Sequence, residues 1–152
     1  MVNSRNKGAS GERELADLLM SWGGEVGVQL DLKRNLEQVR GGGHDLDGVP
    51  GLAIECKRVE QLAVATWWKQ AVRQAQTIGG IPLLCYRQNR KPWRFMVRAP
   101  VTFLDSTGAA ASTRWLDLDM DQEQGRLWYQ GYLLARGLGA TGAALGGQEP
   151  PS

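Results

Sequence analysis

Residues 41–58, GGGHDLDGVPGLAIECKR, gather more ionisable side chains among strand-forming and turn-forming residues than any other part of the chain. Segment 52–57 is apolar until its last residues and follows a Pro-Gly turn signal, so it predicts a β-strand. Because strand side chains alternate between faces, Glu55 and Lys57 share one face beside a small alanine. The other face is apolar, and we expect it to pack into a core.

Asp45 precedes Glu55 by ten residues, and the Pro-Gly turn between them would let a hairpin bring the two carboxylates together. Converging carboxylates repel each other and shift their pKa values unless a cation lies between them. A site made of oxygen ligands suits Mg²⁺ or Mn²⁺. The alternative is a salt-bridged surface strand, in which Lys57 simply pairs with one of the two carboxylates.

The spacing Asp-x9-Glu-x-Lys resembles the active-site motif of the PD-(D/E)xK nuclease superfamily, with His44 where that motif usually has proline. Asp47 is a rival for the first carboxylate, but it lies nearer the turn, so Asp45 is preferred. Two longer segments, NKGASGERELADLL (6–19) and RNLEQVRGGGHDLDGVPGLAIECKR (34–58), are similar to the archaeal-type Holliday junction resolvase family and its phage relatives. This likeness extends to about residue 100.

The resemblance implies an α/β fold with a restriction-endonuclease-like αβββαβ core, in which helices flank a mixed central sheet. On this basis residues 1–100 would form the nuclease core. Residues 101–136 would be a C-terminal extension of uncertain structure, and the Gly-, Ala- and Pro-rich residues 137–152 a disordered tail.

The resemblance also implies an active site. Its catalytic residues would be Glu12, Asp45, Glu55 and Lys57, and its Mg²⁺ ligands Asp45, Glu55 and the Cys56 backbone carbonyl, with Mn²⁺ able to substitute. Glu12 would act on the metal directly or through water, and Lys57 would position the attacking water or stabilise transition-state charge. The helical pattern alone leaves Glu12 open, because a carboxylate beside an apolar stripe could also reach water or pair with Arg13 or a basic strand residue.

Periodicity predicts the other elements. The expected helices cover 9–22, ended by Gly23-Gly24, and 66–78, capped by Thr66 with Trp68, Ala71, Val72, Ala75 and Ile78 buried. Strands are expected within 25–40 and at 81–86, 93–98 and 114–120, with a loop at 105–113. A weak helical pattern follows, interrupted by Gly125 and Gly131.

The formal net charge of +2 is unevenly distributed, because residues 1–100 carry +5 and residues 101–152 carry −3. A basic body permits a polyanionic partner. The stretch from Arg87 to Arg98 is notably basic, with no acid between Glu60 and Asp105. The DNA-binding candidates are Arg5, Lys7, Arg34, Gln38, Arg40, Arg58, Lys69, Arg73, Arg87, Arg90, Lys91 and Arg94.

Cys56 and Cys85 both fall in apolar strand-like segments, which predicts buried free thiols in a reducing cytosol. No window approaches the roughly 18 apolar residues that a membrane-spanning helix requires, so no membrane association and a cytoplasmic location are expected.

The resemblance implies a metal-dependent, structure-specific endonuclease that acts on branched double-stranded DNA, foremost a Holliday junction resolvase. Such an enzyme must cut two strands, which implies a homodimer with two sites. The alternatives are another PD-(D/E)xK nuclease, restriction-like or exonucleolytic, and a catalytically silent DNA-binding module.

Overall fold

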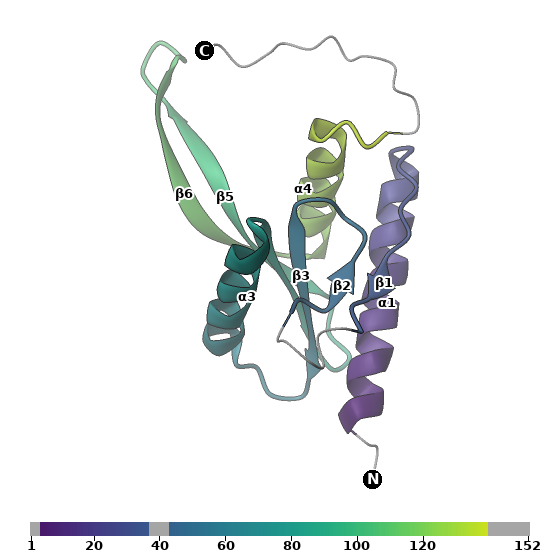
Figure 1. Cartoon of the computed structure of the whole chain (residues 1–152). Helices are drawn as coiled ribbons and strands as arrows, with labels where there is room; N and C mark the ends of the chain where they lie inside the picture. The colour runs from purple at the N-terminus through teal and green to yellow at the C-terminus, as the bar shows by residue number, and fades with distance from the viewer. Residues whose placement is uncertain (1–3, 37–42, 140–152) are drawn as a thin grey trace.

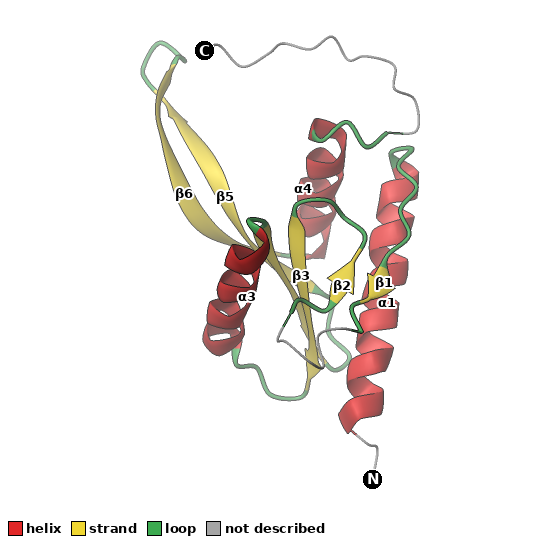
Figure 2. Cartoon of the chain, viewed as in Figure 1, coloured by secondary structure: helices red, strands yellow, loops and turns green. Residues whose placement is uncertain are grey.

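The computed structural model of the chain describes residues 4–36 and 43–139, with side chains from residue 8 onward. Its elements are α1 (Ser4–Glu25), β1 (Lys33–Arg34), β2 (Leu46–Asp47), β3 (Leu52–Val59), α3 (Val64–Ile78), β4 (Ile81–Gln88), β5 (Arg94–Leu104), β6 (Ala110–Met120) and α4 (Gln122–Ala135) (Figures 1 and 2).

The strands form one sheet of six in the order β1-β2-β3-β4-β5-β6. β3 and β4 run parallel, with α3 as the crossover between them, and the other neighbours are antiparallel. The first six elements therefore follow the order αβββαβ around a mixed sheet. This confirms the predicted restriction-endonuclease-like fold class.

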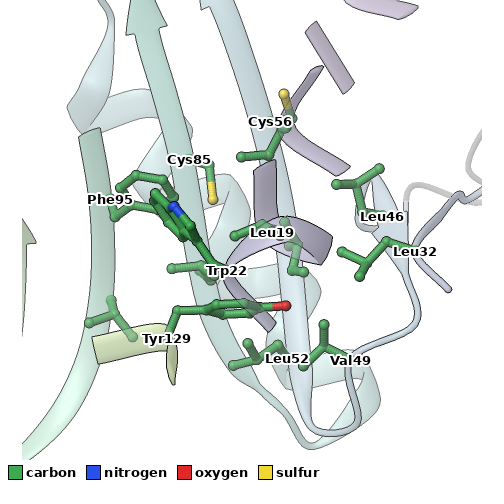
Figure 3. Packing of buried hydrophobic residues seen from close by; sticks show 14 of the residues in the cluster. Leu19, Trp22, Leu32, Leu46, Val49, Leu52, Cys56, Cys85, Phe95 and Tyr129 are labelled. Atoms are coloured by element: carbon green, nitrogen blue, oxygen red, sulfur yellow. The ribbon is translucent and has the colours of Figure 1, made fainter. Parts of the chain in front are cut away.

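Helices cover both faces of the sheet. On one face, α1 and α4 pack against β3, β4 and β5 in the main core, where Trp22, Phe95 and Tyr129 meet (Figure 3). On the other face, Trp68 and Ala71 of α3 pack against β4. Leu52, Ile54 and Cys56 all point into the main core, as the alternation along β3 predicted.

The prediction for α3 was right about its position and wrong in two details. Thr66 is not its cap, because the helix begins at Val64 after Ala63, whose side chain makes no capping hydrogen bond. Ile78 is half exposed and not part of the buried stripe, whereas Gln74 is buried. The helix stops at Gly79, which adopts the left-handed conformation with φ of 62° that favours glycine.

Residues beyond 100 form more regular secondary structure than their sequence pattern predicted. β5 runs through residue 100, and β6 already begins at Ala110, so the predicted loop 105–113 shrinks to a tight turn. α4 is continuous, starts at an Asp121–Gln124 capping box, and places Tyr129 and Leu133 in the main core. The boundary suggested at residue 100 thus falls inside a strand, and the last helix shares the core of the first.

Three further expectations concern less regular features. Of the predicted strand within 25–40, the described part forms only the two-residue β1, and residues 37–42 lie outside the described part. Cys56 and Cys85 are buried free thiols, as predicted, and they are neighbours across the β3–β4 ladder. Among the described residues, no helix has the length and apolar character of a membrane span.

Candidate active site

The short hairpin from β2 to β3 brings Asp45 beside β3. Leu46 pairs with Ile54, and the Asp45 amide donates to the Ile54 carbonyl at 2.8 Å. The Asp45 carboxylate then accepts a hydrogen bond from the Cys56 amide at 2.7 Å. With 5% of its surface exposed, Asp45 is held against the strand that carries Glu55 and Lys57.

Glu55 is fully buried on the face of β3 opposite the main core. Its Oε1 accepts hydrogen bonds from Lys57 Nζ at 2.8 Å and from Gln70 Nε2 of α3 at 3.2 Å. Its Oε2 is buried and has no partner among the described residues. A buried carboxylate oxygen without a donor or cation is unfavourable, which favours a proton or a bound cation at this oxygen.

The pKa values of Glu55 and Lys57 are shifted by burial and by the nearby charges. Burial, followed by the charge of Asp45, raises the pKa of Glu55 to about 7, against the opposing effect of Lys57. Burial alone would lower the pKa of Lys57, but the hydrogen bond to Glu55 and the charges of Glu55 and Asp45 outweigh it, so the pKa is raised. Lys57 therefore stays a cation beside two acids that repel each other.

Glu12 reaches the same site from α1. An open cavity of about 450 Å³ is lined by Glu12, Asp45, Cys56 and Lys57, together with residues at the end of β3. Glu12 also forms an ion pair with Arg34 of β1. Glu12 therefore lines the cavity and at the same time pairs with a basic strand residue, and its part in catalysis stays a prediction.

The structure also separates the two rival aspartates. Asp47 is half exposed and pairs with His44. Leu46, which separates Asp45 from Asp47 in the chain, is buried in the main core. Asp45, unlike Asp47, lines the cavity with Lys57. This geometry favours Asp45 as the first carboxylate of the motif.

The donor set fits a hard divalent cation, although it forms no complete cage. Among residues 8–36 and 43–139, no three His, Cys, Asp or Glu side chains are grouped to hold a metal. Mg²⁺ commonly keeps several waters and takes only one or two carboxylates from the protein, with phosphate oxygens supplying the rest. Two repelling carboxylates, with the orphaned Glu55 Oε2, match that mode of binding.

The DNA-binding candidates fall into two groups in the structure. Four of them are ion-paired: Arg34 with Glu12, Arg58 and Arg87 with Glu14, and Arg94 with Asp119. The basic stretch without acids in the sequence is thus partly neutralised in space, because β6 supplies Asp119 to Arg94 and Asp117 to Arg98. Both β6 aspartates lie opposite β5, where the antiparallel ladder puts them.

The second group has no acidic partner among the described residues and consists of Lys69, Arg73, Arg90 and Lys91. Lys69 and Arg73 lie on the exposed side of α3, and the other two lie in the turn from β4 to β5. That turn contacts the end of β3, since the Asn89 amide donates to the Val59 carbonyl at 3.0 Å. Gln38 and Arg40, and the side chains of Arg5 and Lys7, lie outside the described part.

Two residues that the sequence did not single out belong to the site or its surroundings. Gln70 donates a hydrogen bond to Glu55, and Glu14 forms ion pairs with both Arg58 and Arg87. Gln70 could have been found from its spacing, because Gln70 and Gln74 lie four residues apart on one side of α3. No comparable local signal exists for Glu14, whose partners come from two strands far along the chain.

Comparison with known proteins places the chain in a family. The model of a family described as "Phage putative PDDEXK endonuclease" matches residues 3–126. A search of curated proteins found no match. Among solved structures, the Holliday junction resolvase Hjc of Archaeoglobus fulgidus is similar, with 23% identity, a TM-score of 0.41, and coverage of 74% of this chain and 85% of that one.

Proposed function

Because its family model covers most of the chain, this protein belongs to the phage PDDEXK endonuclease family, and from that premise we propose a metal-dependent endonuclease that hydrolyses phosphodiester bonds in branched DNA. The observation that supports this most directly is the buried Glu55, which pairs with Lys57 and whose pKa is raised in part by the negative charge of Asp45. A surface salt bridge alone does not account for a fully buried carboxylate with one unsatisfied oxygen.

The residues have separable roles in this proposal. Asp45 and Glu55, with the Cys56 carbonyl, would hold Mg²⁺ or Mn²⁺, and Glu12 would contribute directly or through water. When bound, the cation lowers the pKa of a water and neutralises charge on the scissile phosphate. The Lys57 ammonium, held at 2.8 Å from Glu55, positions the attacking water or donates to a phosphate oxygen as negative charge develops.

The sequence resemblance to junction resolvases makes a four-way junction the preferred substrate. Resolution of a junction requires two cuts on opposing strands, so the working form is a homodimer with two equivalent sites. We expect this enzyme to act in the cytoplasm, where its substrate would be.

The proposal is tested by incubating a synthetic four-way junction and a linear duplex of the same sequence with the wild-type protein and with Glu55→Ala. The reactions are run in Mg²⁺, Mn²⁺ and Ca²⁺. We expect paired symmetric nicks in the junction with Mg²⁺ or Mn²⁺, and a loss of at least about 100-fold in Glu55→Ala. Binding of the junction in Ca²⁺ should be retained by the variant.

Other outcomes would replace the proposal with a different one. Equal cutting of the linear duplex would indicate a restriction-like nuclease, and shortening from free ends an exonuclease. Binding without cleavage in any divalent ion would indicate a DNA-binding module. Glu55→Ala that cuts like the wild type would exclude this cleft as the active site.

A further inference from the structure

β5 and β6 form a ribbon that is longer than the body of the protein needs. In Figures 1 and 2 the two strands leave the sheet beside α3 and project away from it. Every residue from Thr102 to Asp117 is exposed. We call residues 102–116, which comprise the exposed part of this ribbon and its turn, the arm.

The arm is an ordered structure. At its tip the Asp105 carboxylate accepts hydrogen bonds from the Thr107 amide at 2.8 Å, the Thr107 hydroxyl at 2.6 Å and the Ala109 amide at 3.1 Å. At its base Asp117 accepts from Arg98 at 2.7 Å and from the Trp68 indole at 2.9 Å. The ribbon is therefore fixed at both ends before any partner binds.

The surface of the arm is apolar and almost uncharged. It carries four large exposed hydrophobic side chains: Phe103 (48% exposed), Leu104 (63%), Trp115 (63%) and Leu116 (39%). Its charged residues are Asp105 and Arg114, which cancel. Because affinity for nucleic acid depends on Lys and Arg contacts to phosphates, this composition favours a protein partner over DNA.

The arm also has an open edge. β6 is the last strand in the sheet order, so the outer edge of its eleven residues pairs with no other strand among the described residues. Long, apolar edge strands pair with other extended strands unless they are protected. The opposite edge of the sheet is the two-residue β1, which offers little to pair with. Pairing through β6 would therefore close after two chains.

We infer that the outer edge of β6 pairs antiparallel with the β6 of a second copy of this chain, which joins two sheets into one across a two-fold axis. The axis would lie at Trp115, the midpoint of Ala110–Met120, because this register pairs the whole strand. Arg114 then faces Leu116 of the partner, and Asp117 faces Thr113 of the partner. No like charges stand opposite each other, whereas an axis at Arg114 or Asp117 would set a charge against itself.

The need for a dimer with two active sites rests on the proposed function, whereas the open edge of β6 is a feature of the structure itself. The experiment is therefore an oligomeric-state measurement that does not depend on cleavage. Light scattering after gel filtration, over a range of concentrations, should give the wild-type chain a mass of twice 16.7 kDa.

Two substitutions of one residue test the register. Leu116→Arg sets an arginine against Arg114 of the partner, and it should raise the dimer dissociation constant by roughly tenfold or more. Leu116→Asp removes the same side chain but sets a carboxylate against that arginine, so it should preserve the dimer. Leu127→Arg, at an exposed leucine of α4 away from the arm, is the control and should also stay dimeric.

Each result decides the inference separately from the nuclease proposal. A wild-type monomer at all concentrations overturns it, as does a Leu116→Arg protein that remains as dimeric as Leu116→Asp. A monomeric wild type whose junction binding falls in Leu116→Arg overturns it in favour of DNA contact by the arm. An inactive protein that dimerises and responds to Leu116 as described supports the arm interface while the proposed activity fails.

Discussion

The hydrogen bond from Gln70 to Glu55 links the crossover helix to the cleft. Gln70 and Lys57 both donate to the same oxygen, Oε1, whereas Oε2 has no partner among the described residues. We expect Gln70→Ala to lower kcat for junction cleavage by about tenfold, because a less constrained carboxylate binds and orients its ligand less well. Junction affinity in Ca²⁺ and the thermal midpoint should change little.

The control for this variant is Gln76→Ala, on the exposed side of the same helix. It should leave kcat unchanged. If both variants lost activity equally, or if Gln70→Ala raised KM with kcat intact, Gln70 would not act by positioning Glu55.

The two cysteines give a prediction that is independent of activity. Burial raises the pKa of both Cys56 and Cys85 well above the ordinary value for a thiol. Since the thiolate is the reactive form, a disulfide reagent at pH 8 should modify neither residue in the native protein within minutes. Both thiols should react at once in guanidinium chloride. Rapid stoichiometric labelling of the native protein would contradict the burial of these two thiols between β3 and β4 and the helices that cover them.

At the level of side chains, the sequence predicted which residues share a face of β3, because alternation is a local property. Leu52, Ile54 and Cys56 confirm this on the core side. The partners of the charged groups could not be predicted in the same way. Glu14 pairs with Arg58 and Arg87 because α1 crosses the ends of two strands, and that arrangement exists only after the sheet has formed.

α4 contains two glycines with opposite roles. A Cβ at Gly125 would lie 2.4 Å from Cδ2 of Phe95, so the helix and β5 approach this closely only because no side chain is present. We expect Gly125→Ala to reduce the free energy of unfolding by about 1–3 kcal/mol through overpacking of a buried ring. Urea denaturation measures this loss.

Gly131 supplies the matched comparison on the same helix. A Cβ there would meet nothing within 4 Å, so Gly131→Ala should raise the free energy of unfolding by up to about 1 kcal/mol through helix propensity. Equal effects of the two substitutions would show that α4 does not contact β5 as described.

These glycines also explain why the last helix was hard to predict. Gly125 and Gly131 weaken the helical pattern, while the stability of α4 comes from Tyr129 and Leu133 in the core and from the Asp121 capping box. β6 is similar, since its first residues, AAST (110–113), have little strand propensity and extend only because β5 pairs with them. In both elements tertiary contacts override a local preference.

The distribution of paired and unpaired basic groups predicts where DNA is held. Arg90 and Lys91 have no acidic partners in the described structure, and their turn is hydrogen-bonded to Val59, which lines the cavity. Arg94 and Arg98, in contrast, are neutralised by β6. Replacing both Arg90 and Lys91 by Gln should weaken junction binding and reduce the slope of log K against log salt by about 1.8, or about 0.9 for each lost phosphate contact.

The corresponding control replaces Arg94 and Arg98 by Gln. Because these arginines already have carboxylate partners, the salt slope should change by less than about half as much. The measurement is made in Ca²⁺ so that cleavage does not interfere. A larger effect from the control pair would mean that the ion pairs to Asp117 and Asp119 open when DNA binds.

The contacts between the first and last helices, α1 and α4, determine when the fold can be completed. Gln130 donates to the Trp22 carbonyl at 3.0 Å and Arg126 pairs with Glu25 at 2.7 Å, although these partners are about a hundred positions apart. Contacts at such separation form late and slow the folding of a domain. A chain still being synthesised has no α4 against which α1, with Glu12, can be packed. The candidate active site is therefore expected to become complete only after residues up to 135 have left the ribosome, because α4 must be free to pack against α1.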